Sequence, residues 1–241
     1  MLRFVDVSYH AGEREILSHL SFDLTEGETL VLLGRSGSGK TTALRMVNAL
    51  LTPSSGEVLV EGRATTAWNP IELRRRIGYV IQETGLFPHF TVARNIGVVP
   101  RLNRWAPERI EARVHQLLER VGLAPAEYAG RYPRELSGGQ RQRVGVARAL
   151  AADPPMLLFD EPFGALDPVT RHELRREFTA LARDLGKTTL FVTHDIREAL
   201  ELGDRIGLLA NGRMQELLPA RDFPSAVSSE AQAFLACLRD D

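Results

Sequence analysis

The chain has 241 residues, 44% of them hydrophobic, and its 30 basic and 31 acidic residues give a net charge of −1. This length is sufficient for an α/β domain with its own hydrophobic core, and the charge balance excludes a general attraction to nucleic acid, so no nucleic-acid partner is expected. The single cysteine, Cys237, excludes an intrachain disulfide, and nothing in the sequence points to a cysteine-based metal site.

Short apolar runs alternate with helical patterns along the chain, the order typical of an α/β protein. The expected strands are Leu2–Val7, Leu17–Leu24, Thr29–Leu33, Glu57–Val60, Ile77–Val80, Met156–Phe159, Thr189–Val192 and Ile206–Leu209. Turn residues rather than helices separate the early strands, which predicts an N-terminal antiparallel β portion beside a mostly parallel core sheet. The N-terminus MLRFVDVSYH is not a secretory signal, and no segment approaches the roughly 18 uninterrupted apolar residues of a membrane helix.

Helical periodicity replaces the strand signals between residues 91 and 152. Within Pro107–Val121, for example, the apolar residues recur at helical spacing. The sequence therefore predicts one domain, 1–241, with a core of residues 1–90 and 153–224, an inserted helical subdomain of residues 91–152, and a closing helix in residues 225–241.

Residues 34–42 read GRSGSGKTT directly after the apolar run Leu30–Leu33, which is the pattern G-x-x-x-x-G-K-[ST] at the end of a buried strand. Glycines in such a loop let backbone N–H groups turn toward phosphate oxygens, the lysine reaches the β- and γ-phosphates, and the next hydroxyl can ligate Mg²⁺. A helix beginning near Gly39 would direct its positive end at the same phosphates. An accidental Gly/Ser-rich loop is the weaker interpretation. The residues expected to bind the nucleotide are Gly34, Arg35, Ser36, Gly37, Ser38, Gly39, Lys40, Thr41 and Thr42.

Two acids follow the apolar run Met156–Phe159. In an α/β sheet the carboxyl end of a strand faces the ligand crevice. Asp160 can then hold Mg²⁺, and Glu161 can polarise an attacking water. The alternative is a strand that ends in a solvated acidic turn, and the upstream phosphate-binding pattern makes this alternative the weaker one.

The segment Leu136-Ser137-Gly138-Gly139-Gln140, taken with these two patterns, resembles the signature motif of the ABC-type ATPases. The remaining elements of that family match in order: Gln82 after a strand, Gly164-Ala165-Leu166-Asp167 after Glu161, His194 after the strand Thr189–Val192, and Tyr9 where the family places a ring on adenine. The resemblance covers nearly the whole chain. It implies a P-loop NTPase fold with a RecA-like core.

The resemblance also implies roles for these residues. The catalytic set would be Glu161, His194, Lys40 and Gln82, and the Mg²⁺ ligands Thr41, Gln82 and Asp160. Ser137, Gly138, Gly139 and Gln140 would face ATP bound to a second copy, so that two chains in head-to-tail orientation enclose two ATP molecules, with Asp167 near the seam. Alternatives remain: a plain helix cap for Ser137-Gly138-Gly139, a hydrogen-bonded structural role for His194, and packing for Tyr9.

The run Ile77–Val92 is similar to that of importer ATPases, in which the segment after the glutamine contacts a membrane permease. Within this run, the sequence Tyr79-Val80-Ile81-Gln82 followed by Gly85-Leu86-Phe87-Pro88-His89 resembles that of the ATPases of quaternary-amine importers for glycine betaine, choline or carnitine. The implied partners are an integral-membrane permease and, indirectly, a solute-binding protein, with the chain peripheral on the cytoplasmic face of the inner membrane. Alternatively, Leu86, Phe87 and Phe90 pack the helical subdomain onto the sheet.

Other functions stay open within the family. The alternatives are an importer of amino acids, sulfonates or other small solutes, an exporter, and an ABC ATPase that moves no solute. ABC ATPases of the last class typically have paired nucleotide domains, a coiled-coil insertion or a strongly basic surface, and the sequence shows none of these. Many quaternary-amine ATPases carry a C-terminal pair of CBS modules. Residues 225–241 leave room for only a short tail, so regulation by such modules is not expected.

Overall fold

The computed structural model describes residues 1–82, 85–164 and 167–238. The chain divides into two compact units, the first made of Met1–Arg74 with Gly186–Asp241 and the second of Arg75–Leu185. None of the helices in the described ranges is long and apolar enough to span a membrane.

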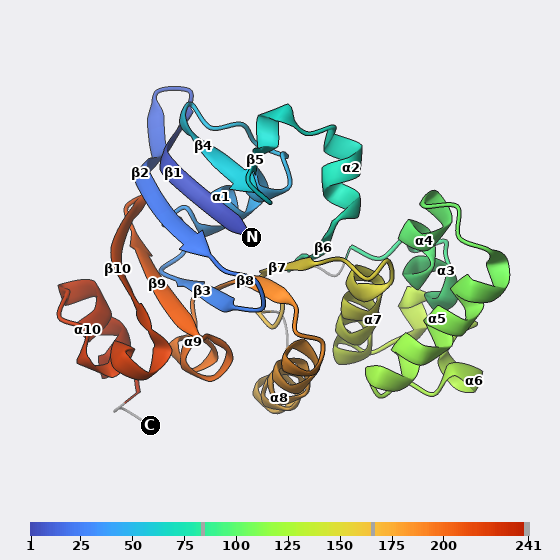
Figure 1. Ribbon diagram of the computed structural model, residues 1–241. Coiled ribbons are helices and arrows are strands. Elements are labelled where there is room, and N and C mark those ends of the chain that lie inside the picture. The colour runs from blue at the N-terminus through green and yellow to red at the C-terminus, as the bar shows by residue number, and fades with distance from the viewer. Residues whose placement is uncertain (83–84, 165–166, 239–241) are drawn as a thin grey trace. The chain divides into compact units, whose positions relative to one another are not determined.

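The first unit contains an antiparallel sheet with the strand order β2-β1-β4-β5 (Figure 1). Its strands are β1 (Leu2–Ala11), β2 (Arg14–Leu24), β4 (Ser55–Val60) and β5 (Arg63–Ala64). Phe4 and Phe22 pair across β1 and β2, and their rings stack with centroids 4.4 Å apart. The expected antiparallel N-terminal portion is confirmed. Strand β5 was not expected, because two residues are too short to show a pattern.

The first unit also contains strands in the order β10-β9-β3-β8. These are β3 (Thr29–Leu33), β8 (Thr188–Thr193), β9 (Arg205–Ala210) and β10 (Arg213–Pro219). Strand β3 runs parallel to β8 and β9, and β10 pairs antiparallel with β9. Strands β3 and β8 are buried almost throughout, as the continuous apolar runs of a parallel sheet require. Strand β10 was not expected, because its half-buried residues lack a clear alternation.

Three α-helices accompany these strands: α1 (Lys40–Val47), α9 (Ile196–Leu202) and α10 (Ser229–Ala236). The first unit also holds the 3₁₀ turns η1 (Thr65–Ala67) and η3 (Ala220–Ser225), and α2 (Pro70–Arg75) lies at its end. The C-terminal end of α1 is capped by Arg74, whose guanidinium donates to the carbonyl oxygens of Asn48 and Ala49 at 3.1 and 2.9 Å. A cation at this end satisfies carbonyls that have no partner within the helix.

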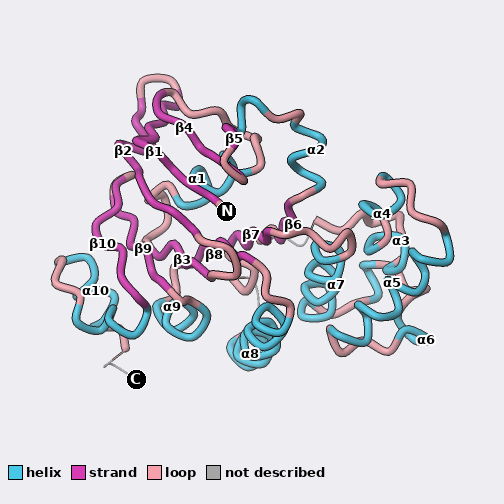
Figure 2. Tube along the Cα trace, in the orientation of Figure 1, coloured by secondary structure: helices cyan, strands magenta, loops and turns pink. Residues whose placement is uncertain are grey.

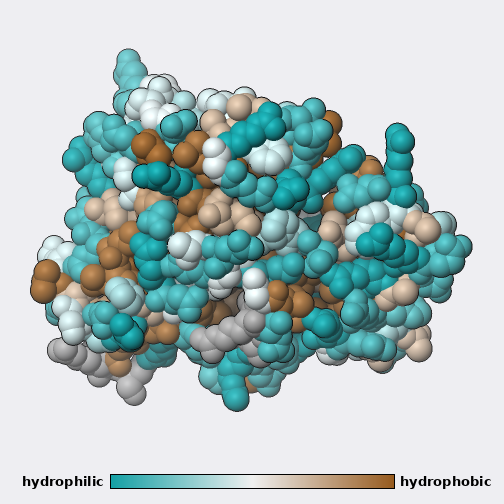
Figure 3. All heavy atoms as spheres, viewed as in Figure 1, coloured by the Kyte–Doolittle hydropathy of each residue, from teal (hydrophilic) through white to brown (hydrophobic). Residues whose placement is uncertain are grey.

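The second unit holds a parallel pair of strands, β6 (Ile77–Val80) and β7 (Met156–Asp160), and a set of helices. The helices are α3 (Val92–Ile96), α4 (Val98–Leu102), α5 (Pro107–Arg120), α6 (Pro125–Tyr128), η2 (Pro133–Glu135), α7 (Gly138–Leu150) and α8 (Pro168–Asp184). Figure 2 shows only helices and loops in the described chain between β6 and β7. On the face seen in Figure 3, hydrophilic residues predominate over α3 to α6.

The helical periodicity of Pro107–Val121 is confirmed by α5, which buries Ile110, Val114, Leu117 and Leu118. The expected helical subdomain, residues 91–152, lies inside the second unit, whose limits are wider. The subdomain limits therefore remain a prediction.

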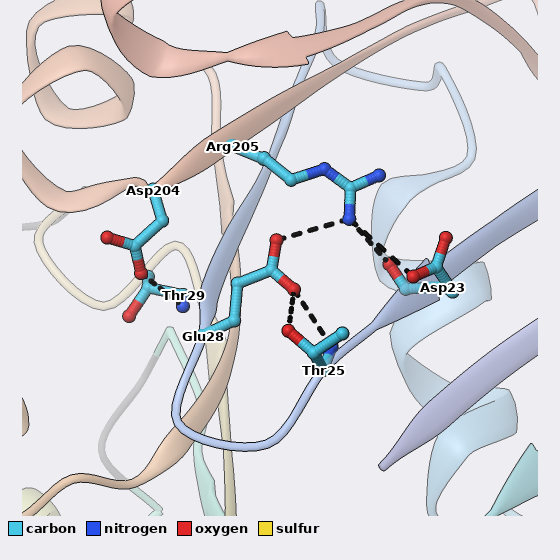
Figure 4. Close-up of polar contacts among 6 residues, drawn as sticks. All are labelled: Asp23, Thr25, Glu28, Thr29, Asp204 and Arg205. Atoms are coloured by element: carbon cyan, nitrogen blue, oxygen red, sulfur yellow. Dashed lines mark hydrogen bonds and ion pairs between the residues drawn. The ribbon is translucent and has the colours of Figure 1, made fainter.

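A polar network ties the start of β3 to the start of β9 (Figure 4). Glu28 accepts hydrogen bonds from the backbone N–H and hydroxyl of Thr25 at 2.8 and 2.6 Å, and its other oxygen accepts from Arg205 at 3.1 Å. Asp204 accepts from the backbone N–H of Thr29 at 2.8 Å. Burial raises the pKa of Glu28, but the Thr25 hydrogen bonds and the Arg205 charge together outweigh it, so the pKa lies below its usual range.

We expect Glu28→Gln to lower the free energy of unfolding by about 1–2 kcal/mol near pH 7, because the charged hydrogen-bond acceptor is lost. A pKa that is lower in the folded state stabilises the fold above the unfolded-state pKa, and this contribution disappears as the pH falls through the folded-state value. The wild type should therefore lose its advantage over the variant as the pH falls from about 5 toward 3. Urea unfolding across this range measures the effect. Glu26→Gln is the control, and equal unfolding energies for the two variants would contradict the prediction.

Candidate nucleotide-binding site

The loop of residues 34–39 between β3 and α1 curls around the ammonium group of Lys40. Lys40 is only 4% exposed, and its Nζ donates to the carbonyl oxygens of Gly34 at 2.7 Å and Arg35 at 2.9 Å. Gly37 and Gly39 have φ values of 79° and 105°, in the left-handed region that favours glycine. The loop thus holds a buried cation at the start of a helix, where backbone N–H groups lack helical partners.

Two glycines let this loop pack closely on its neighbours. A Cβ on Gly34 would lie 2.3 Å from the carbonyl oxygen of Leu209 in β9, and one on Gly39 would lie 2.5 Å from the side chain of Leu17 in β2. Ser38 accepts a backbone hydrogen bond of 3.2 Å from Gly212, in the turn between β9 and β10. The loop conformation is therefore fixed by packing as well as by its own sequence.

The loop exposes Arg35, Ser36 and Gly37, while Thr41 and Thr42 are half-buried. Ser38 is 6% exposed, and its buried Oγ has no hydrogen-bond partner in the part of the chain that is described. An unsatisfied buried hydroxyl is costly, so its presence fits a loop built to receive the oxygen atoms of a ligand.

Tyr9 and His194 belong to the same unit as this loop. Tyr9 is half-buried on β1 and pairs with Leu17, the residue whose side chain approaches Gly39. Leu33 and Thr193 are paired in parallel strands, so Gly34 and the exposed His194 leave the sheet at the same edge.

The turn that carries His194 is fixed by side chains that sequence reasoning missed. The Thr193 hydroxyl donates to the carboxylate of Glu198, which is 4% exposed. Asp195 caps α9 by accepting from the backbone of Arg197 at 2.8 Å and of Glu198 at 3.4 Å. The Thr193 hydroxyl also accepts from the N–H of Asp195. The sequence pattern Asp-x-x-Glu after an apolar strand could have predicted this helix start.

In the second unit, polar groups gather at the carboxyl ends of β6 and β7. Asp160 is 7% exposed, and the Tyr79 hydroxyl donates to its Oδ2 at 3.1 Å. Glu161 has a φ of 46°, which is unusual and strained for a residue with a side chain. A Cβ on Gly164 would lie 3.4 Å from Gln82 Nε2 and 4.0 Å from Glu161 Oε2. Gln82 and Glu161 thus border the same small glycine. Tyr79 was missed because its partner is distant in sequence.

The segment Ser137-Gly138-Gly139-Gln140 forms the start of α7. Ser137 and Gln140 make a capping box: the Ser137 hydroxyl accepts from the Gln140 N–H at 3.2 Å, and the Gln140 side chain accepts from the Ser137 N–H at 2.9 Å. Gln140 also donates to the Tyr128 hydroxyl at 3.2 Å. Ser137 is exposed, whereas Gly139 is buried, with the methyl group of Thr170 at 2.8 Å from the position of a Cβ.

Asp167 stands at the start of α8. Hydrogen bonds from the backbone and then the hydroxyl of Thr170 lower the pKa of this exposed carboxylate. Ala165 and Leu166, which precede Asp167 in the expected motif, lie outside the described residues.

The segment after Gln82 is held by a buried amide. Asn95 is fully buried, accepts from the N–H of Phe87 at 2.8 Å, and donates to the carbonyl oxygens of Phe87, Phe90 and Thr91 at 3.1 Å each. Phe87 is 42% exposed, and its ring lies 5.1 Å from that of the half-buried Phe90. Glu83 and Thr84 lie outside the described residues. The segment therefore presents an exposed aromatic side chain on backbone that Asn95 holds by hydrogen bonds.

A cavity of about 650 Å³ lies among the helices of the same unit. Its lining includes Ala93 on α3 and Trp105, Ile110 and Val114 at or near α5. Helix α3 thus connects the two features, because Asn95 holds the Phe87 segment and Ala93 faces the cavity.

The predicted site residues therefore fall into two groups. The first unit brings together Tyr9, the loop 34–42 and His194, and the second brings Gln82 to Asp160 and Glu161. Ser137–Gln140 begin α7 and Asp167 begins α8 in the second unit.

These features are those of a P-loop ATP-binding protein, and comparison with known proteins gives the family. The ABC transporter profile matches residues 17–164, and the chain belongs to the ABC transporter family. Its fold is that of an ABC ATPase, in which an antiparallel β portion accompanies a parallel core sheet.

The chain is similar to three curated transport proteins. It is 49% identical to the glycine betaine/carnitine/choline transport ATP-binding protein OpuCA of Bacillus subtilis, covering 90% of this chain and 57% of OpuCA. It is 48% identical to the glycine betaine uptake system ATP-binding protein YehX of Escherichia coli, covering 92% and 75%. It is 47% identical to the sulfate/thiosulfate import ATP-binding protein CysA of Vibrio cholerae, covering 90% and 57%. The chain thus spans little more than half the length of two of these three relatives, OpuCA and CysA.

Among solved structures, the chain resembles the ATP-binding cassette MJ0796 in a dimeric post-hydrolysis state bound to ADP and Pi. The TM-score is 0.81 at 34% identity, and the match covers 92% of this chain and 99% of the cassette.

We expect Gly139→Ala to destabilise the second unit by about 1–3 kcal/mol, because the new methyl group would overlap Thr170. Thr170→Ser removes the obstructing methyl group and keeps the hydroxyl, so the double variant should recover most of the loss. Urea unfolding measures these energies. Gly130→Ala is the matched control, since its Cβ position has no atom of the described residues within 4 Å apart from its chain neighbours. An equal loss in the single and double variants would show that the close contact is not the cause.

Proposed function

We propose that this chain is the ATP-hydrolysing subunit of an ABC importer. The observation that carries the proposal is the loop of residues 34–39 wrapped around the buried ammonium of Lys40. Phosphate oxygens are stronger acceptors for the Lys40 ammonium than the carbonyl oxygens of Gly34 and Arg35, because the phosphate oxygens carry negative charge and the carbonyl oxygens do not. Tyr9 would stack on the base, as its strand position near Leu17 and Gly39 permits.

The oxygen atoms available suit Mg²⁺. Its protein ligands would be the Thr41 hydroxyl, the Gln82 amide and the Asp160 carboxylate. Mg²⁺ binds through one or two carboxylates plus waters and substrate phosphates, so a single buried acid such as Asp160 fits this pattern. When bound, the ion would neutralise charge on the β- and γ-phosphates. Tyr79 would orient Asp160 through the hydrogen bond between them.

Glu161 is proposed as the base that accepts a proton from the attacking water. Its left-handed backbone turns the carboxylate out of the line of β7, toward Gly164. His194 would hold the γ-phosphate and the water in line, supported by the Thr193–Glu198 hydrogen bond beneath its turn. Positioning and electrostatics supply most of the acceleration in phosphoryl transfer, so these groups are sufficient.

Two copies are proposed to close head to tail around two ATP molecules. The Ser137 hydroxyl and the N–H groups that begin α7 would then meet the γ-phosphate held by the other copy, with Gly138, Gly139 and Gln140 forming the rest of that surface. Support comes from the exposure of Ser137 and from the dimeric state of the similar cassette MJ0796. ATP enclosed in this way stabilises the dimer by mass action.

The partner is proposed to be a membrane permease that docks on the segment of residues 82–92, with a solute-binding protein supplying the solute. Asn95 supports this segment, and the exposed Phe87 supplies an aromatic anchor of the kind that dominates binding energy at interfaces. The chain would then lie on the cytoplasmic face of the inner membrane as a peripheral subunit.

The solute is proposed to be a quaternary amine used as an osmoprotectant. OpuCA and YehX carry this substrate class in their names, and the chain resembles both over most of its length. An importer of sulfate is the second candidate, because the identity to CysA is nearly as high.

We expect Glu161→Gln to retain ATP binding while hydrolysis falls by a factor of about 10² or more, because the proton acceptor is lost and the shape is kept. Phosphate release and calorimetric binding of Mg²⁺·ATP measure the two effects. Glu127→Gln is the control, since Glu127 is exposed and forms an ion pair with Arg131. Turnover near the wild-type rate in Glu161→Gln would refute the assignment of the base.

The partner is tested by a pull-down of tagged Glu161→Gln protein from detergent-solubilised native membranes with ATP. We expect recovery of a permease together with a quaternary-amine-binding protein. Adding Phe87→Ala should reduce the recovery about tenfold or more, whereas Ile71→Ala, which alters an exposed apolar residue of the first unit, should not. A different permease would keep the mechanism and change the solute. A complex without any membrane protein would refute the transport function.

A further inference from the structure

The C-terminal helix α10 is anchored to the first unit. The backbone N–H of Ser228 donates to the carboxylate of Glu216 in β10 at 2.6 Å, and the Ser228 hydroxyl caps the helix by accepting from Ala231 at 3.3 Å. Ala231 is fully buried, and Leu235 is 6% exposed. The hydrogen bonds from Ser228 also lower the pKa of Glu216, so this anchor is intact at neutral pH. The helix thus occupies a defined position next to β10 (Figure 1).

One residue of this helix reaches the phosphate-binding loop. Arg35 donates from Nε to Glu230 Oε1 at 2.7 Å, although the two residues are 195 positions apart in sequence. The Arg35 side chain is 68% exposed and that of Glu230 is 25% exposed. The carbonyl oxygen of the same Arg35 accepts from Lys40. Arg35 therefore connects the residue that holds the phosphates with the C-terminal helix.

The charge of Glu230 opposes the chemistry of the loop. Arg35 and Lys40 are two cations within a six-residue stretch that binds a polyanion. A carboxylate held against Arg35 neutralises one of them and adds its own repulsion toward phosphate. An ATP molecule in the loop would in turn compete with Glu230 for the guanidinium group.

We propose that Glu230 is a positioning residue that restrains Arg35 and lowers the affinity of the loop for ATP, so that nucleotide binding and the docking of α10 oppose each other. The inference rests on the proposed binding of ATP to this loop. Linkage is reciprocal: if the contact weakens ATP binding by a given factor, ATP weakens the contact by the same factor. The position of the C-terminal helix thereby reports on, and regulates, the nucleotide state of the loop.

The effect has a bounded size. Ion pairs that are partly exposed contribute little, because solvent screens them and the side chains lose entropy when they pair. Removing the contact should therefore tighten Mg²⁺·ATP binding by about two- to fivefold.

The first experiment measures Mg²⁺·ATP affinity by calorimetry in the Glu161→Gln parent, which prevents turnover. Adding Glu230→Gln should lower Kd about two- to fivefold. Asp222→Asn is the matched control: it removes an exposed acid from the preceding turn, where Asp222 forms an ion pair with Arg221. This control should leave Kd unchanged within error.

A double-mutant cycle then separates the pair from a general charge effect. In the Arg35→Gln background, Glu230→Gln should change Kd by much less than in the parent, because the neutralised cation is absent. An unchanged or weaker affinity in Glu230→Gln would overturn the proposal. So would an equal gain in both backgrounds or in Asp222→Asn. A parent that binds no Mg²⁺·ATP at all would instead refute the proposed function and this inference with it.

Hydrogen exchange of residues 231–237 tests the reciprocal effect. Saturating Mg²⁺·ATP should speed exchange in this helix in the parent. It should have little effect in the Glu230→Gln variant, which lacks the Arg35–Glu230 ion pair. Equal exchange with and without ATP in the parent would contradict the linkage, and thermal unfolding of each variant shows whether the fold itself is intact.

Discussion

The burial of the Lys40 ammonium is the constraint on which the first unit depends. A buried cation is tolerated only when acceptors surround it, and here the acceptors are backbone carbonyls of the loop itself. The loop can curl in this way because Gly34 and Gly39 carry no side chain where Leu209 and Leu17 approach. Leu209 of β9 and Leu17 of β2 therefore constrain the geometry of the loop.

Much of this arrangement could be predicted from the sequence, because its signals are local. Adjacent residues are enough to recognise the buried strand Thr29–Leu33, the glycine-rich loop after it and the acids after Phe159. The structure confirms the two strands, β3 and β7, that precede the loop and contain or precede the acids. The contacts that could not be predicted join distant segments. Tyr79 contacts Asp160 because β6 and β7 pair in parallel register. Glu230 contacts Arg35 because the C-terminal helix α10 lies near the loop that follows β3.

Strand β10 shows a further limit of sequence reasoning. Strand β10 forms a hairpin with β9, and most of its residues are half-buried. Apolar and polar residues do not alternate regularly along it, so the sequence pattern does not predict a strand there. Its register with β9 nevertheless determines where Glu216 lies, and Glu216 determines where α10 begins. An element with a weak local pattern can therefore help to position a residue, Glu230, that contacts Arg35 in the loop.

The start of α7 shows that a structural and a functional interpretation of one motif need not compete. In the capping box the Ser137 hydroxyl accepts from the Gln140 N–H and the Gln140 side chain accepts from the Ser137 N–H, which is sufficient to explain why the helix begins there. A hydroxyl that accepts in this way keeps its own proton for donation. Ser137 is exposed, so the same side chain that starts the helix retains a donor for a phosphate oxygen. Gly139 is buried close to the methyl group of Thr170, and this contact by itself requires a residue without a side chain at that position.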